Sequence, residues 1–289
     1  MPVEESVCGM LKDLSIQKQV DESFQRPVSE PGRLSDYYDG EVMKKRNEAL
    51  AGEETIDLIL FQDLFSVVSP IGSAKSKYKI LGTYLTLGNL KPWIRSKLNA
   101  MRLVMLFKEP LINQMQTIHE ARTQISDLTA GVRQCFGALL TDLQKLVKEG
   151  IMYKGRRVRV RLTHILGDNL GSHMIGGFRQ FFKSGHVCRF CTLTLEKFKM
   201  GCGKGVTVLT GKLRCRAHYK RCVLRAKLLN LSHSLGIKHN SVFNGLGDFH
   251  VCDGLPPCIA PDFFEGVGSE DLALILKDLV AKNGSPTSS

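Results

Sequence analysis

Three apolar stretches within residues 55–107 constrain the fold more than any other feature of this chain. Residues 55–70 and 77–90 are rich in leucine, β-branched and aromatic residues, and a Gly/Ser/Lys-rich turn separates them. This pattern predicts an antiparallel β-hairpin. Residues 100–107 form a third short apolar run, which predicts a third strand.

The periodicity becomes helical after residue 111. Apolar residues recur at three- and four-residue intervals as far as residue 146, and Gly150 follows as a helix stop. Residues 158–166 begin by alternating valine with arginine, which predicts a fourth strand, and residues 167–182 lead into another helix. The resulting β-β-β-α-β-α order differs from the βαβα alternation of dinucleotide-binding folds. It is the order of the RNase H-like fold, so we predict an α/β protein with an RNase H-like mixed sheet.

The segments around this core differ in composition. Four regions are expected: a loose polar N-terminal segment with short helices at most (1–50), the RNase H-like core (51–182), a basic Cys/His insertion (183–250) and a C-terminal segment (251–289). In the last region, Ser269 can cap a helix that ends near Gly284. Its apolar face, from Leu272 to Val280, has to pack within the chain or on a partner, so an interaction module is one interpretation.

The overall composition excludes several classes of protein. Apolar residues make up 43% of the 289 residues, which argues against a wholly disordered chain. The acidic start lacks the apolar core of a secretory signal, and no apolar run approaches the length of a membrane span. Nine cysteines, an odd number, indicate free thiols or metal ligands. We therefore expect an intracellular protein without a membrane partner.

The positive charge is concentrated in the middle of the chain. The formal net charge is +12, and residues 176–227 hold 13 bases but one acid, whereas both ends are acidic. A basic region of this kind favours binding to DNA phosphates. The candidate contacts are Arg156, Arg157, Arg159, Lys183, Arg189, Lys212, Arg214 and Arg216. Alternatively, the bases form a solvated surface covered by the acidic ends.

Two aspartates suggest metal-dependent chemistry. Asp63 lies within or at the end of the first predicted strand, and Asp168 follows the fourth. These strands are neighbours in an RNase H-like sheet, which would place both carboxylates at one edge. Paired carboxylates can hold the Mg²⁺ or Mn²⁺ ions of phosphodiester chemistry. Alternatively, Asp168 caps the next helix and Asp63 is a residue of a strand-end loop.

The cysteines suggest a structural zinc site. Cys188 and Cys191 form a CxxC pair, and Cys215 and His218 complete a C-x2-C…C-x2-H set with 23 residues between the halves. A closed four-ligand site of this type would stabilise a loop-rich insertion. The alternative is free cysteines in a small subdomain.

Several segments together resemble a known family. They are SDYYDGE, ILFQDLFSVVSPIGSAKSKYKILGTYLTLGNL, GDNLGSHMIGGF, VCRFC and GLPPCIAPDFFEGV, in this order across residues 33–268. The combination resembles the transposase core of cut-and-paste DNA elements in animal genomes. It is similar to the CACTA/Plavaka-type DDE transposases, which are distant relatives of the V(D)J recombinase catalytic subunit.

The resemblance implies metal-dependent DNA strand cleavage and transfer by an RNase H-like core with a zinc-bearing insertion. It implies that Asp63 and Asp168 are the first two metal-binding acids and that the CxxC pair binds zinc. Where the family usually has His-Asp, this chain has Pro261-Asp262, so His250 joins His218 as a candidate zinc ligand.

The third acid of related enzymes lies farther along the chain, in a later helix. Glu265 and Glu270 are the nearest acids here, and we expect a truncated core that lacks the third acid. The sequence thus predicts a transposase-derived nuclear protein that binds DNA and is compatible with a homo-oligomer. Its catalytic activity is an open question. The alternative is a non-catalytic, zinc-stabilised DNA-binding or regulatory protein.

Overall fold

The computed structural model describes most of the chain. The described residues are 2–26, 32–66, 79–108, 130–180, 185–201, 211–229, 232–258 and 268–283, with single positions between 111 and 119. Among these residues, none of the helices combines the length and the apolar composition that crossing a bilayer requires.

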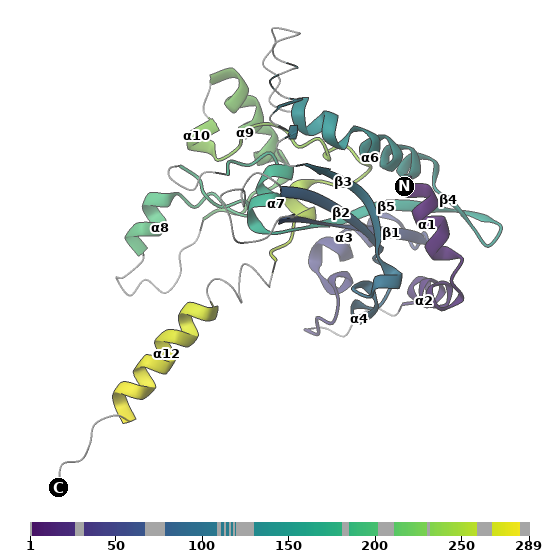
Figure 1. Cartoon of the computed structure of the whole chain (residues 1–289), viewed down its shortest axis with the longest axis horizontal. Coiled ribbons are helices and arrows are strands. Elements are labelled where there is room, and N and C mark those ends of the chain that lie inside the picture. The colour runs from purple at the N-terminus through teal and green to yellow at the C-terminus, as the bar shows by residue number, and fades with distance from the viewer. Residues whose placement is uncertain are drawn as a thin grey trace.

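A five-stranded sheet forms the centre of the structure, with the strand order β3-β2-β1-β5-β4 (Figure 1). The strands are β1 (Thr55–Ser66), β2 (Lys79–Leu87), β3 (Arg102–Lys108), β4 (Ile151–Tyr153) and β5 (Arg156–Leu166). β2 pairs antiparallel with both β1 and β3, whereas β1 and β5 run parallel. The predicted hairpin and the third and fourth strands are confirmed, and the chain is an α/β protein with a mixed sheet.

The short strand β4 was not predicted. It pairs antiparallel with β5 across a two-residue turn, where Lys154 and Gly155 have φ values of 48° and 78°. Positive φ at both positions matches the twist of a tight hairpin. Three residues are too few to give a recognisable alternation, so β4 left no signal in the sequence.

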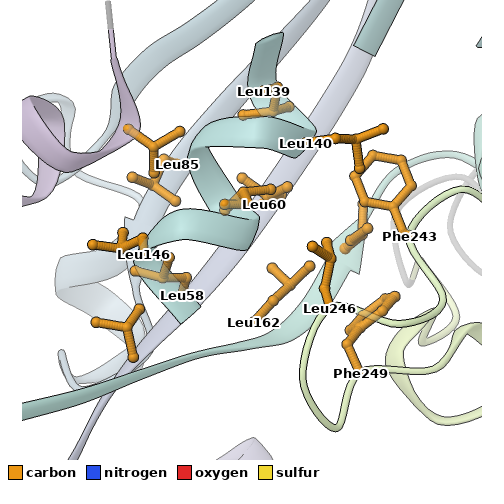
Figure 2. Close-up of a cluster of buried hydrophobic side chains, with 14 of the residues drawn as sticks. Leu58, Leu60, Leu85, Leu139, Leu140, Leu146, Leu162, Phe243, Leu246 and Phe249 are labelled. Carbon is orange, nitrogen blue, oxygen red and sulfur yellow. The ribbon is translucent and has the colours of Figure 1, made fainter. Parts of the chain in front are cut away.

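Helix α6 (Ala130–Glu149) covers one face of the sheet. Its side chains Phe136, Leu139, Leu140, Leu143 and Leu146 are buried against leucines of β1, β2 and β5, as Figure 2 shows for part of this cluster. Gly150 ends the helix with φ of 71°, as predicted. Most of the predicted helical stretch before Ala130 lies outside the described residues.

The N-terminal segment is more ordered than expected. It forms α1 (Val3–Leu11), α2 (Leu14–Phe24), a short 3-10 turn (Tyr37–Asp39) and α3 (Glu41–Ala49). Val3, Val7 and Met10 of α1 are at most 1% exposed and belong to the main core. Short helices are present as allowed for, but the expectation of a loose segment is wrong, because the apolar stripe of α1 packs into the core and is hidden within a polar average composition.

The second half of the chain adds helices around the same core. They are α7 (Asn169–Ile175), α8 (Leu195–Gly201), α9 (Arg216–Leu229), α10 (Ser232–Leu235) and α11 (Val251–Gly254), with α4 (Pro92–Arg95) and the 3-10 turn Leu98–Ala100 earlier in the chain. Tyr219 of α9 is 1% exposed and donates a 2.7 Å hydrogen bond from Oη to the carbonyl of Gly176. Phe243, Leu246 and Phe249 pack near α6 (Figure 2). The basic region thus contributes to the core of the protein.

The predicted C-terminal helix is present as α12 (Gly268–Asn283). Figure 1 shows it directed away from the sheet. The apolar side chains from Leu272 to Val280 remain 49–69% exposed. The predicted stop, Gly284, lies outside the described residues.

His164 on β5 predicts a specific dependence of stability on pH. Its ring meets Tyr37 edge-on, with the centroids 5.0 Å apart. Burial, and secondarily the charge of Arg46, lower the pKa of His164 from 6.5 to about 4. Between these two values the unfolded chain binds a proton that the folded chain does not, so the free energy of unfolding falls as the pH drops.

This contribution is best measured with a variant whose side chain at position 164 is polar and of similar size but does not titrate. We expect the melting temperature to fall more between pH 7 and pH 5 in the wild type than in His164→Gln. An equal fall in both proteins, measured by circular dichroism, would show that His164 is not buried in its neutral form.

Candidate functional site

The parallel pairing of β1 and β5 brings the two predicted acids to the same edge of the sheet. Phe61 of β1 is in register with Leu166 of β5, and Asp63 and Asp168 each lie two residues farther along the chain. Asp63 is still within β1, opposite Gly82 of β2, whereas Asp168 follows the end of β5. The predicted proximity of strands one and four is therefore confirmed.

Asp63 and Asp168 line the same small pocket, which has a volume of about 30 Å³. The pocket is also lined by Gln62, Leu64, Leu81, Ile112, Leu170, Gly171, Met174 and Gln180. Asp63 and Asp168 are exposed to solvent. A space of this size accepts a water molecule or a small ion.

Each carboxylate uses Oδ1 for a local hydrogen bond. Asp168 Oδ1 accepts a 2.6 Å bond from the amide of Gly171 and thereby caps α7. Asp63 Oδ1 accepts a 2.8 Å bond from the amide of Leu64. The capping role predicted as the alternative for Asp168 is thus real. It leaves Oδ2 as the atom through which a cation would be bound.

Gln62 is a further member of the site that the sequence did not reveal. It is 2% exposed, and within the described residues neither Oε1 nor Nε2 has a hydrogen-bond partner. A Cβ atom added to Gly171 would approach Gln62 Nε2 to 3.2 Å and Asp168 Oδ1 to 2.8 Å, so these groups are closely packed. Gln62 thus places a buried, unpartnered amide near the Asp168 carboxylate and in the same pocket as Asp63, and an amide oxygen is a donor of the kind that Mg²⁺ prefers.

The third acid is not part of the described site. No group of three or more His, Cys, Asp or Glu side chains in the described part of the chain could hold a metal ion. Glu265 lies outside the described residues, and the side chain of Glu270 in α12 is likewise not described. The donors present suit a hard divalent cation in their chemistry, with two carboxylates and one amide oxygen.

The two cysteine-containing segments are joined by backbone hydrogen bonds. The Arg214 amide donates to the Phe190 carbonyl at 2.8 Å, and Cys191 forms a β-bridge with Leu213. Because Cys215 directly follows Arg214, this pairing places the backbone of Cys215 close to the CxxC turn.

Within that turn, the amide of Phe190 donates to Cys188 Sγ at 3.3 Å. Burial raises the pKa of the Cys191 thiol, partly offset by the amide of Leu193. The donor types are those that zinc uses, but in the described residues three of them do not converge.

The two histidines proposed as zinc ligands have different surroundings. His218 Nε2 lies 3.5 Å from Cys222 Sγ, one turn along α9. Burial, followed by the charge of Arg214, lowers the pKa of His218, which favours the neutral ring that binds metals. His250 instead caps α11, where its Nδ1 accepts a 3.1 Å bond from the Cys252 amide. His250 thus uses one ring nitrogen as a helix cap, whereas the ring of His218 contacts a cysteine sulfur.

The predicted DNA contacts fall into two groups. Arg189 and Arg214 are 5% and 6% exposed, and they donate 3.1 Å hydrogen bonds to the carbonyls of Pro256 and Cys188, respectively. These two side chains hold the fold together, because a backbone phosphate of a DNA duplex cannot reach a guanidinium buried to this degree.

The remaining predicted contacts lie nearer the surface. Three of them form ion pairs: Arg156 with Glu54, Arg159 with Glu53 at 3.1 Å, and Arg216 with Asp253 at 2.5 Å. Arg157 donates a hydrogen bond to the carbonyl of Glu149. Lys212 is exposed. Lys183 lies outside the described residues. The pairing with Glu53 and Glu54 matches the alternative in which acidic segments cover the bases. Lys212 and Arg157 are exposed and form no ion pair with an acid among the described residues, so they remain candidates for phosphate contact.

No protein-family model matches this chain, and no curated protein matches it either.

Proposed function

We propose that this chain is a transposase-derived protein with an RNase H-like core that carries out metal-dependent cleavage and transfer of DNA strands. The observation that carries the proposal is the presence of Asp63 and Asp168 in one pocket, at the ends of two adjacent parallel strands. The strand order β3-β2-β1-β5, with β1 parallel to β5, supports the RNase H-like assignment.

The residues of the pocket would bind the catalytic cation. Asp63 and Asp168 would hold Mg²⁺ or Mn²⁺, with the buried amide of Gln62 beside them. The bound cation supplies the Lewis acidity that activates a water molecule or a DNA 3′-hydroxyl and stabilises the leaving oxygen. The hydrogen bonds to Oδ1 restrain the orientation of both carboxylates, and Oδ2 of each would be available to bind the cation.

The basic residues would position the DNA. Lys212 and Arg157 are exposed, form no ion pair with an acid among the described residues, and would contact phosphates without reading sequence. A DNA substrate implies a nuclear location.

The experiment that tests the proposal is cleavage of a supercoiled plasmid by the purified full chain in Mn²⁺ or Mg²⁺. DNA binding is recorded in parallel, and Asp63→Asn is prepared identically to exclude a contaminating nuclease. We expect nicking that requires the metal and that the variant loses. Binding without nicking, unchanged in the variant, would overturn the enzymatic proposal.

One observation favours a second candidate function. Within the described residues no third acid approaches the aspartate pair. A site with two acids holds a second cation weakly, and most of the catalysis would then be lost. The second candidate is a non-catalytic, zinc-stabilised DNA-binding or regulatory protein, and salt-sensitive binding that ignores Asp168→Asn would identify it.

The proposed zinc site gives a separate prediction. We propose that Cys188, Cys191, Cys215 and His218 hold a structural zinc ion, with the paired backbone segments as its scaffold. The purified protein should contain about one zinc per chain, and Cys191→Ser should lower this content and the melting temperature together. Cys135→Ser, which changes a half-buried cysteine of α6, is the matched control. Elemental analysis that finds no zinc in a folded wild type would contradict the site.

A further inference from the structure

A second cavity lies near the opposite ends of β1 and β5 from the aspartate pair. Its volume is about 500 Å³, and it is bounded by α3, β5 and the segments around Asp248 and Asp253. Five cationic side chains line it: Lys45, Arg46, Arg159, Arg161 and Arg216. Asp248 and Asp253 are the two carboxylates in its lining, so positive charge dominates.

The alternation of β5 explains how these arginines reach the cavity. Val158, Val160 and Leu162 are buried on the side of the core that α6 covers. The intervening residues therefore face the other side of the sheet, where α3 lies (Figure 1). There Arg161 Nη2 donates a 2.8 Å hydrogen bond to Asn47 Oδ1 of α3.

Two of the arginines carry buried donors without acceptors. Arg46 is 8% exposed, and its Nε and Nη2 have no hydrogen-bond partner in the described residues. The nearest carboxylate oxygens, on Asp248 and Asp253, are 3.7 and 3.9 Å away, beyond hydrogen-bond distance. Arg161 is 4% exposed, and its Nη1 is likewise without an acceptor among the described residues. Buried charged donors of this kind normally have a partner.

The pKa of Arg46 reflects burial and charges of both signs around it. Burial lowers the pKa of its guanidinium, Asp248 and Asp253 act in the opposite direction, and Arg216 and Arg161 lower the pKa further. The cations have partial partners outside the cavity, since Asp57 binds Arg161 and Glu53 binds Arg159. The unpartnered nitrogens remain even with these pairs in place.

We propose that this cavity binds a phosphate monoester, with Arg46, Arg161 and Arg216 as its ligands. A phosphate offers three oxygens to planar guanidinium groups, which bind such groups in a bidentate manner. The backbone of a DNA duplex cannot reach side chains that are 4% and 8% exposed, whereas a terminal phosphate can enter the cavity. A free nucleotide and the 5′-phosphate of a single strand share this chemistry. The proposal does not rest on the aspartate pair and stands if cleavage is not observed.

The test measures binding of inorganic phosphate to the full chain by calorimetry, at constant ionic strength with chloride as the reference. We expect specific binding that Arg216→Gln weakens roughly 10-fold, because it removes one charged hydrogen-bond donor. Asp253→Asn should instead tighten binding, because in the wild type Asp253 Oδ2 accepts a 2.5 Å hydrogen bond from Arg216 Nε and so competes with phosphate for this donor. A gain in affinity cannot arise from a variant that has failed to fold. Arg133→Gln, an exposed arginine of α6 outside the cavity, should change affinity by less than about 2-fold.

Two further ligands distinguish the sources of the phosphate. Tighter binding of adenosine monophosphate than of phosphate would identify a nucleotide, and tighter binding of a 5′-phosphorylated oligonucleotide than of its 5′-hydroxyl twin would identify a DNA end. The proposal is overturned if phosphate binds no better than chloride. It is also overturned if Arg133→Gln and Arg216→Gln weaken binding equally, or if Asp253→Asn leaves the affinity unchanged.

Discussion

Asp57→Ala should destabilise the protein by about 3–5 kcal/mol, the cost of removing one partner of a buried ion pair. Asp57 of β1 is fully buried, and its carboxylate accepts bonds of 2.5 and 2.9 Å from Nε and Nη2 of Arg161. Tyr38 Oη donates to it at 2.6 Å, Thr55 Oγ1 at 2.9 Å and Tyr37 Oη at 3.2 Å. Without this carboxylate, Arg161 would be a buried and uncompensated charge.

The pKa of Arg161 supports the same conclusion. Burial acts to lower the pKa of this guanidinium, but the hydrogen bonds and charge of Asp57 outweigh it and raise the pKa above its usual value. Urea denaturation of Asp57→Ala, Arg161→Met and the double variant measures the coupling between the two residues. We expect the double variant to be more stable than the sum of the single effects predicts. Additive losses would show that the pair is not coupled.

Asp63→Asn and Asp168→Asn should each lower metal-dependent strand cleavage roughly 100-fold or more, because a lost carboxylate removes several kcal/mol of stabilisation from the transition state. Both residues line one pocket, and neither is buried, so the variants should fold normally. DNA affinity should remain within about 2-fold of the wild type, since phosphate contacts dominate binding.

Asp168 needs a control for its structural role. Its Oδ1 caps α7, and asparagine caps helices about as well as aspartate does. Asp168→Asn therefore removes the charge and keeps the cap, whereas Asp168→Ala removes both and should cost a further ~1 kcal/mol of stability. Equal cleavage by wild type and Asp168→Asn, with lower stability only in Asp168→Ala, would show that Asp168 acts only as the N-cap of α7 and not as a metal ligand.

The parts of the fold that follow from local periodicity could be predicted from the sequence. The hairpin of β1 and β2, the strand β5 and the helix α6 all have clear patterns of period 2 or 3.6. The proximity of Asp63 and Asp168 also followed, because the ends of parallel neighbouring strands meet at one edge. By contrast, the apolar stripe of α1 was masked by the polar composition around it.

The pairing of charges across the sequence could not be predicted in the same way. The alternation of valine and arginine in β5 predicted a strand but not the burial of Arg161, which is buried because Asp57, 104 residues away, lies opposite it in the sheet. Gln62 was missed for a related reason. Its burial depends on the close approach of Gly167, which follows β5, and of Gly171 in α7. A single sequence carries no signal for such partners.

The most direct test of the metal-binding site is a titration of the protein with Mn²⁺, followed by electron paramagnetic resonance. At least one Mn²⁺ per chain should bind to the wild type, more weakly to Asp63→Asn and to Asp168→Asn, and not measurably to the double variant. Equal Mn²⁺ binding by the wild type and the folded double variant would contradict the assignment of these two aspartates as the metal ligands.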